Sequence, residues 1–172
     1  MKSYLLLFSS FCFLILQSCK KENTEPAIQL KTTFKKDGII EELDTYHCTV
    51  KPNNSNPGNT DFVLMARSKD FKKVFSIVIQ VNGLFTTGSY QTVIGSGHYP
   101  VIADYFLNQG QPGERGYALD QAPGMAPGQF SVEITSMDNN YIKGTFSGNY
   151  LYDSDYDESI VINDGEFTAR VR

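Results

Sequence analysis

The chain has 172 residues, 41% of them hydrophobic, and its 15 basic and 19 acidic side chains give a net charge of −4. An acidic chain without a basic stripe argues against nucleic-acid binding, which needs Lys and Arg side chains to neutralise phosphates. The length suits one domain and is sufficient to bury a hydrophobic core without disulfide bonds.

The N-terminus carries the features of an export signal. Lys2 precedes an apolar stretch over residues 4–16, and Leu16-Gln17-Ser18-Cys19 closes it. The stretch is too short to cross hydrocarbon of ~30 Å as a helix, which is typical of a signal peptide. The closing four residues resemble the lipobox of bacterial lipoproteins, whose cysteine receives diacylglycerol and becomes the first residue after cleavage. We therefore expect residues 1–18 to be a lipoprotein signal peptide and Cys19 to be the lipid attachment site.

Residues 19–26 are expected to form a polar, lipidated tether that holds the protein on the membrane. Position 20 is Lys rather than the Asp that retains lipoproteins in the inner membrane, so the resemblance implies an outer-membrane lipoprotein. Lys21-Glu22 partly matches the surface-export signal of Bacteroidota lipoproteins. The expected location is the cell envelope, with the domain either facing the periplasm or exposed at the surface.

From residue 27 onward apolar and polar side chains alternate, which is the period of β-strands. Asp37-Gly38 and Asn82-Gly83 fit tight turns, because Gly adopts a positive φ without strain. After the second turn the chain is expected to return through Leu84-Phe85. Asn163-Asp164-Gly165 lies inside the last run and indicates a β-bulge or a very tight hairpin. Strands are expected at about residues 28–34, 39–50, 62–66, 74–81, 98–107, 130–134, 141–152 and 160–171. Residues 27–172 are thus predicted to form a single all-β domain, an antiparallel β-sandwich or flattened β-barrel of about eight to nine strands.

The alternation also predicts which side chains form the core. Seven are expected inside the domain: Phe75, Ile77, Ile79, Val132, Ile134, Ile142 and Phe146. Cys48 is expected in the core as a small hydrophobic residue rather than a nucleophile. Its neighbour His47 points to the opposite face of the strand, which weakens any Cys–His pairing. His98 is the other histidine, and since neither lies in a catalytic motif, we predict no catalytic residue and no cofactor.

Residues 108–128 are rich in Gly and Pro and are predicted to connect two strands without regular structure. Connections of this length are uncommon in compact domains and are either functional or disordered. If this one binds a ligand, Arg115, Tyr117 and Asp120 are its expected contacts, because they offer charge or aromatic area.

Two C-terminal segments carry a family resemblance. They are Ile142-Lys143-Gly144-Thr145-Phe146-Ser147-Gly148 and Ile160-Val161-Ile162-Asn163-Asp164-Gly165-Glu166-Phe167. Together they resemble the C-terminal GTF-S … IT-(N/D)G-x-F pattern of small, uncharacterised Bacteroidota lipoproteins, and residues 75–90 are similar to the middle section of these proteins. The resemblance implies a β-rich exported domain and no particular activity.

An acidic loop lies between the last two expected strands. Asp153, Asp155 and Asp157 stand at every second position, a spacing that lets carboxylate oxygens converge on a Ca²⁺ ion. The spacing resembles an EF-hand, but Glu158 stands where that loop needs Gly, and Asp164 replaces its final Glu. The flanks are strands rather than helices. Two interpretations of this loop are left: a calcium site of less regular geometry, or a hairpin loop that only faces solvent.

Three functions fit a lipid-anchored β domain. The first is a ligand-binding or interaction module whose partner is an envelope protein or a glycan. Its tyrosines, such as Tyr90, Tyr105 and Tyr152, would either stack on sugar rings or pack against neighbouring strands. The second is a structural component of an envelope protein assembly that docks through exposed strand edges. The third is a hydrolase that uses a pair of carboxylates.

Overall fold

A computed structural model describes residues 28–92, 101–119, 129–153, 155 and 157–172, without the side chain of residue 150. These residues form ten β-strands: β1 (Lys31–Lys36), β2 (Ile39–Pro52), β3 (Asn59–Arg67), β4 (Lys73–Asn82), β5 (Gly88–Gln91), β6 (Val101–Leu107), β7 (Arg115–Ala118), β8 (Gln129–Met137), β9 (Tyr141–Asp153) and β10 (Glu158–Arg170). The part of the chain that the structure describes contains no helix long and apolar enough to cross a membrane.

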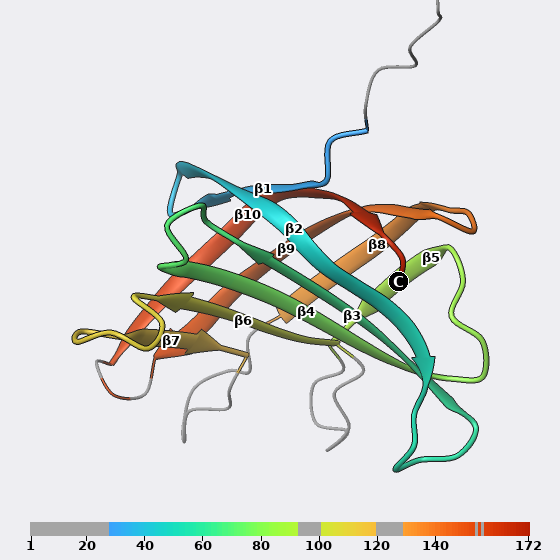
Figure 1. Cartoon of the computed structure of the whole chain (residues 1–172). Coiled ribbons are helices and arrows are strands. Elements are labelled where there is room, and N and C mark those ends of the chain that lie inside the picture. Colours follow the sequence, from blue (N-terminus) through green and yellow to red (C-terminus); the bar gives the residue numbers. More distant parts are fainter. Residues whose placement is uncertain (1–27, 93–100, 120–128, 154, 156) are drawn as a thin grey trace, which may run out of the picture.

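The ten strands belong to one antiparallel sheet that curls into a flattened barrel (Figure 1). The strand order is β10-β1-β2-β3-β4-β6-β7-β9, and β9 pairs back with β10 to close the ring. β8 pairs with the first part of β9, and β5 pairs with β8, so these two strands extend one side of the ring. The predicted all-β antiparallel fold is confirmed, with ten strands instead of eight or nine.

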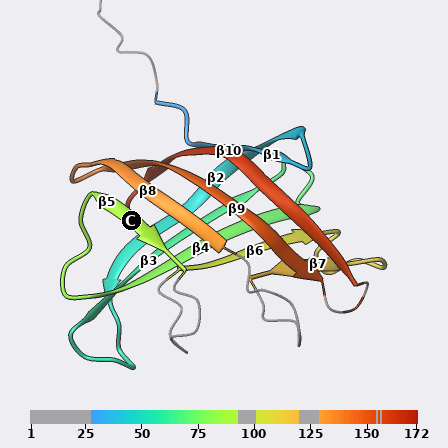
Figure 2. The same ribbon diagram turned by 180° about the vertical axis from the view of Figure 1, so that it is seen from behind.

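The barrel has two layers and two distinct ends. β2, β3, β4 and β6 form one layer, and the view from behind shows β8, β9 and β10 in the other (Figure 2). The loops β1–β2, β3–β4, β6–β7 and β9–β10 gather at one end, on the left of Figure 1. We call this the hairpin end. The loops β2–β3, β4–β5 and β8–β9 lie at the opposite end.

The hairpin between β1 and β2 forms as its turn residues predict. Asp37 and Gly38 have φ values of 49° and 82°, so both central positions of the two-residue turn are left-handed. This backbone matches the right-handed twist of the flanking strands, and Asp and Gly are among the residues that tolerate it best. The Asp37 carboxylate also accepts a hydrogen bond of 2.9 Å from the backbone N–H of Val161, which ties the turn to β10.

The Asn163-Asp164-Gly165 segment is a β-bulge within β10, so the first of the two predicted alternatives is confirmed. The register of β10 shifts between Ile162 and Gly165 relative to β9. Asp164, with φ of 50°, takes the left-handed backbone conformation at the bulge. Gly165 instead faces the interior of the barrel, where it is buried.

The seven side chains predicted for the core are all buried. The interior also holds a continuous file of stacked, tilted and edge-on rings, with neighbouring centroids 4.9–6.4 Å apart: Tyr90, Phe85, Phe62, Phe167, Phe146, Phe75, Phe34, Tyr105 and Tyr117. This file runs from β5 to β7 and packs the inside of the barrel with aromatic side chains.

Two predictions about the connections are wrong. Gly83 does take a positive φ of 90°, but the chain after it does not fold back on β4. It crosses to the other layer, where β5 pairs with β8, and β4 pairs with β3 and β6. The predicted irregular stretch 108–128 contains β7, which forms a hairpin with β6 and one pairing with β9. Residues 120–128 lie outside the described part of the chain.

Three glycines of the two C-terminal segments singled out in the sequence are packing residues. Each lies directly opposite a phenylalanine of the neighbouring strand: Gly144 opposite Phe167, Gly148 opposite Phe130, and Gly165 opposite Phe146. A Cβ atom at any of the three would come within 2.2–2.7 Å of that ring. The motif therefore specifies how β8, β9 and β10 pack.

Candidate functional site

An open groove crosses the outer face of β5, β8, β9 and β10. The polar side chains that line it are Gln91, Thr92, Gln129, Ser131, Ser147, Asn149 and Asn163. None of the described residues that line this groove carries a charge. We call it the amide groove, because four of these residues are Gln or Asn.

The pairing of the strands explains why these side chains share one face. Gln91, Ser131 and Ser147 are register partners on β5, β8 and β9, and Gln129 is opposite Asn149. Since side chains alternate along a strand, the outward row is interleaved with the inward phenylalanines of the core. The β10 bulge leaves Asn163 exposed beside them, and bulges commonly re-aim a side chain in this way.

Most hydrogen-bonding groups of the amide groove face solvent. The Asn149 side-chain oxygen accepts a bond of 3.0 Å from the backbone N–H of Gln129, and the Ser131 and Ser147 hydroxyls are 3.2 Å apart. Within the described part of the chain, the side-chain amides of Gln91, Gln129 and Asn163 form no hydrogen bond. Each of these amides therefore offers both a donor and an acceptor to a ligand.

A second groove continues from the first along the same face and is acidic. Glu133 and Glu166 are both register partners of Thr145, one on each side of it. Both carboxylates are exposed, whereas the acid of a hydrolase is usually set up by burial. The third acid, Asp164, is paired with Lys35 at 2.8 Å. Of the acidic side chains in this groove, Glu133 and Glu166 are the two that could form the carboxylate pair of the hydrolase hypothesis.

The acidic loop between β9 and β10 does not gather its carboxylates. Asp153 is buried, and its Oδ1 accepts a bond of 3.0 Å from the backbone N–H of Asp155. Asp157 instead accepts a bond of 2.7 Å from the Tyr152 hydroxyl, and Asp155 is exposed. No group of three or more His, Cys, Asp or Glu side chains among the described residues is placed to hold a metal ion.

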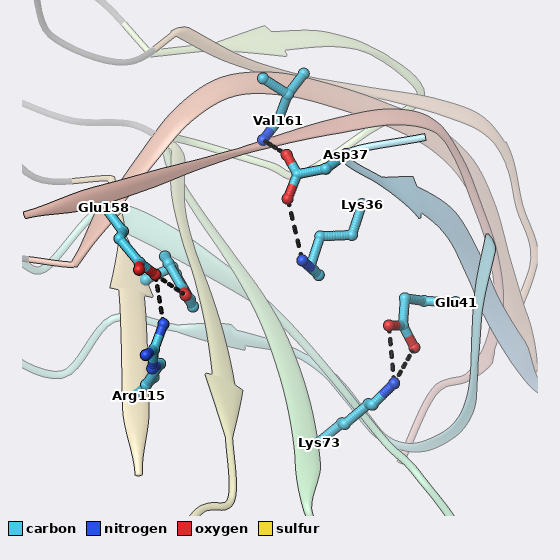
Figure 3. A network of polar contacts seen from close by, with 8 residues as sticks. Lys36, Asp37, Glu41, Lys73, Arg115, Glu158 and Val161 are labelled. Atoms are coloured by element: carbon cyan, nitrogen blue, oxygen red, sulfur yellow. Dashed lines mark hydrogen bonds and ion pairs between the residues drawn. The ribbon is translucent and has the colours of Figure 1, made fainter. Parts of the chain in front are cut away.

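Two of the residues expected as ligand contacts in 108–128 make structural contacts within the barrel. The Arg115 guanidinium forms an ion pair with the Glu158 carboxylate (Figure 3). The Tyr117 hydroxyl donates to the same carboxylate at 3.2 Å. Tyr117 is buried. Both side chains thus hold β7 against the start of β10, and their role as ligand contacts stays a prediction. Asp120 lies outside the described residues.

Other ion pairs surround this contact at the hairpin end. The Lys73 ammonium lies 2.6 and 2.8 Å from the two carboxylate oxygens of Glu41, which is largely buried. Lys36 pairs with Asp37 at 3.0 Å (Figure 3). These ion pairs make the hairpin end polar, in contrast to the aromatic interior of the barrel.

Cys48 and His47 lie on opposite sides of β2, as expected. Cys48 is buried in the core as expected, and burial raises the pKa of its thiol to about 12. A thiol with this pKa is protonated at neutral pH and is not a nucleophile. His47 lines a groove on the outer surface, away from the core that holds Cys48. His98 and Cys19 lie outside the described residues.

The tyrosines favour the packing alternative over an exposed sugar platform. Tyr90 stacks on Phe85, and Tyr105 and Tyr117 are buried. The amide groove was missed from the sequence, because outward polar residues on a strand resemble any solvated face. One signal was available: the outward positions of Gln129, Ser131, Ser147 and Asn149 are all uncharged, although a fifth of the chain is charged.

The chain matches no known family model, and it matches no curated protein and no solved structure. Its function is therefore inferred from the chemistry of its own surface and from the N-terminal sequence signals.

Proposed function

We propose that the protein is an envelope lipoprotein, anchored through Cys19, whose β domain binds a neutral glycan in the amide groove. The observation that carries the proposal is the lining of this groove, which combines four side-chain amides with hydroxyls and contains no charge among the described residues. Sugar hydroxyls are donors and acceptors at once, and an amide side chain matches both functions.

The strands fix the amides in position before a ligand arrives. Gln91, Gln129 and Asn149 belong to paired strands, so little backbone conformational entropy is lost on binding. Each hydrogen bond in such an open groove contributes about 0.5–1.5 kcal/mol. The expected affinity for one glycan is therefore weak, and display of many anchored copies on one membrane would raise the avidity.

The anchor would hold the groove close to the membrane. The stretch from Cys19 to Ile28 reaches at most about 30 Å, at ~3.3–3.6 Å per residue. Gln29 and Lys31, where this stretch joins the domain, line a third groove on the same outer face, beside β8, β9 and β10. A ligand in the amide groove would therefore be a glycan of the envelope or one arriving at its surface.

The test uses the full-length protein in detergent and a panel of neutral hexasaccharides, with binding measured by calorimetry. The double change Gln129→Ala and Asn163→Ala should weaken binding by roughly 5- to 150-fold, because two hydrogen-bonding amides worth about 0.5–1.5 kcal/mol each are lost. Gln80→Ala is the matched control, since it removes an amide from the outer face of β4, away from the amide groove. The absence of binding to every sugar, or an equal loss in Gln80→Ala, would contradict the proposal.

A second candidate function is a structural component of an envelope assembly. It is favoured by Ile39 and Ile40, which are adjacent in the β1–β2 hairpin and 65% and 73% exposed. Two consecutive exposed isoleucines are unusual at a hairpin that only faces solvent. Crosslinking in intact cells that is lost in the Ile39→Ser, Ile40→Ser double variant would support this function, and unchanged crosslinking would contradict it.

A further inference from the structure

The large hydrophobic side chains that the barrel exposes are concentrated on the side where the chain enters it. Among the described residues seven such side chains are exposed. Four of them lie just before β1, at the start of β2 and at the end of β8: Ile28, Ile39, Ile40 and Met137, which are 49%, 65%, 73% and 40% exposed. We call these four the tether-side patch, because the expected tether, residues 19–26, ends next to the first of them. Single exposed hydrophobic residues are ordinary, whereas several on one side indicate a docking surface.

The elements that carry the patch lie along one side of the barrel. Figures 1 and 2 show opposite views, and in both the start of β1, the β1–β2 hairpin and the β8–β9 loop lie along the upper side. Side chains agree with the pictures, because Thr135, two residues before Met137 on β8, lines one groove together with Gln29 and Lys31. The end of β4, which leads into Leu84, lies on the lower side in both views.

The charges around the tether-side patch largely neutralise one another. Three lysines of β1 each pair with an acidic side chain within 3.0 Å: Lys31 with Glu42, Lys35 with Asp164, and Lys36 with Asp37. Lys143 and Glu166, one of each sign, line the groove beside them. Paired charges leave the apolar side chains free to approach headgroups without net charge, while lysine stems lie along the interface with their ammonium groups in water. This side therefore suits a zwitterionic lipid surface and needs no anionic lipid.

The length of the tether keeps this side near the membrane. From Cys19 to Ile28 the chain reaches at most about 30 Å, at ~3.3–3.6 Å per residue. β1 then spans roughly 15–20 Å from Lys31 to Lys36, at ~3.3 Å per residue. The β1–β2 hairpin therefore also lies within the distance from the membrane that the tether allows. Of the barrel surfaces, the one around Ile28 is the nearest to the anchor.

We propose that the tether-side patch rests on the membrane that holds the anchor, with its side chains between the headgroups of the lipid bilayer. The inference rests on the proposed anchor at Cys19 and does not depend on glycan binding. Exposed Ile and Met side chains are stabilised by leaving water, and the anchor supplies the local concentration that a few side chains need. β8 then holds Gln129 up to about 25 Å from Met137, so the amide groove stays clear of the lipid.

Tryptophan fluorescence tests this orientation, because the chain contains no Trp and one introduced Trp reports on a single position. The full-length, lipidated protein is added to phosphatidylcholine vesicles whose acyl chains carry bromine near the headgroup, a quencher of Trp. Ile40→Trp and Met137→Trp should each lose most of their fluorescence relative to unbrominated vesicles. The matched control is Leu84→Trp, which is 88% exposed on the other side of the barrel and should keep its fluorescence. Added salt should change none of these results, because the charges of the patch are paired.

A second measurement separates the contribution of the patch from that of the anchor. In the Met137→Trp protein, the changes Ile39→Ser and Ile40→Ser should reduce the quenching, while the lipid on Cys19 keeps the protein on the vesicles. Ile102→Ser is the control, since it removes an exposed isoleucine from β6, outside the patch, and should leave the quenching unchanged. All of these side chains are exposed, so the variants should fold as the native chain does.

Three results would overturn the proposal. Equal quenching of Ile40→Trp and Leu84→Trp, or none in either, contradicts docking of the patch, and a Cys19 that carries lipid in the same sample leaves the anchor standing. A Cys19 without lipid by mass spectrometry contradicts the anchor and the docking together. Unquenched Ile40→Trp, combined with crosslinks that depend on Ile39 and Ile40, would assign the patch to a protein partner instead of the bilayer.

Discussion

Three glycines of β9 and β10 face the interior of the barrel, each with a phenylalanine ring lying over it. At these positions the absence of a side chain is what allows the ring of the neighbouring strand to lie flat on the backbone. Gly in a strand normally weakens it, and a cross-strand aromatic ring compensates by covering the exposed backbone. At residue scale, the most recognisable motif of the chain thus encodes packing between strands.

Replacement of Gly165 by Ala should destabilise the fold. The new Cβ would lie 2.4 Å from the Phe146 ring and 2.6 Å from the Phe146 backbone oxygen, which cannot move without shifting β9. Overpacking of this kind costs about 1–3 kcal/mol, measured as a lower midpoint in urea denaturation. Gly116→Ala is the control, because its Cβ would meet only the ring of Phe106, and it should change the midpoint much less. Equal effects of the two substitutions would contradict the packing role of Gly165.

Cys48 should make the stability depend on pH in the alkaline range. Burial raises the pKa of its thiol from 9.0 to about 12, so the folded state keeps the proton that the unfolded state releases. The contribution is fully present below pH 9 and is lost as the pH rises toward 12, at about 1.4 kcal/mol per pH unit. Urea denaturation from pH 8 to 10.5 should show this decline in the native chain, and Cys48→Ala should reduce it. Iodoacetamide that labels Cys48 as fast in the folded as in the unfolded protein would contradict it.

At the scale of elements, the predictability of a strand follows from what it packs against. β4 could be predicted because Phe75, Ile77 and Ile79 recur at every second position of a run rich in β-branched residues and pack on the core. β7 could not, because it has four residues, includes Gly116, and is held by long-range contacts to Glu158 that leave no local pattern. The partner of β5 was also missed, since a turn sequence specifies a bend but not the layer in which the next strand pairs.

The core facing of β4 predicts different effects for two adjacent residues. Ile77→Ala removes a fully buried side chain and should lower the free energy of unfolding by about 2–5 kcal/mol. Val78 points to the outer face of the same strand and is partly exposed, so Val78→Ala is the matched control and should cost less than about 1 kcal/mol. Urea denaturation with unchanged slope measures both. A negligible effect of Ile77→Ala would show that the Ile77 side chain does not face the core.

At the scale of the whole molecule, the interior and the surface have separate roles. The aromatic file occupies the inside of the barrel, so the chemistry available to partners lies on the outer face of β5, β8, β9 and β10 and at the hairpin end. Neither location could be predicted from the sequence, because both depend on strands distant in the chain becoming neighbours. The N-terminal export signal, in contrast, is a prediction from consecutive residues and does not depend on the fold.

Anchoring is the property of the whole molecule that the sequence predicts most directly. Cys19→Ala should leave the chain unprocessed and without lipid, because the thiol that receives the diacylglycerol is missing. Metabolic labelling with an alkyne fatty acid, followed by mass spectrometry of the N-terminal peptide, should give a lipid-modified Cys19 in the native chain and no label in the variant. Two or more acyl chains make membrane attachment stable, so the native protein should stay in the membrane fraction in high salt. Cys48→Ala is the control for loss of a cysteine elsewhere and should keep both label and attachment. An unmodified Cys19, or cleavage at another position, would contradict the anchor and with it the location proposed for the glycan site.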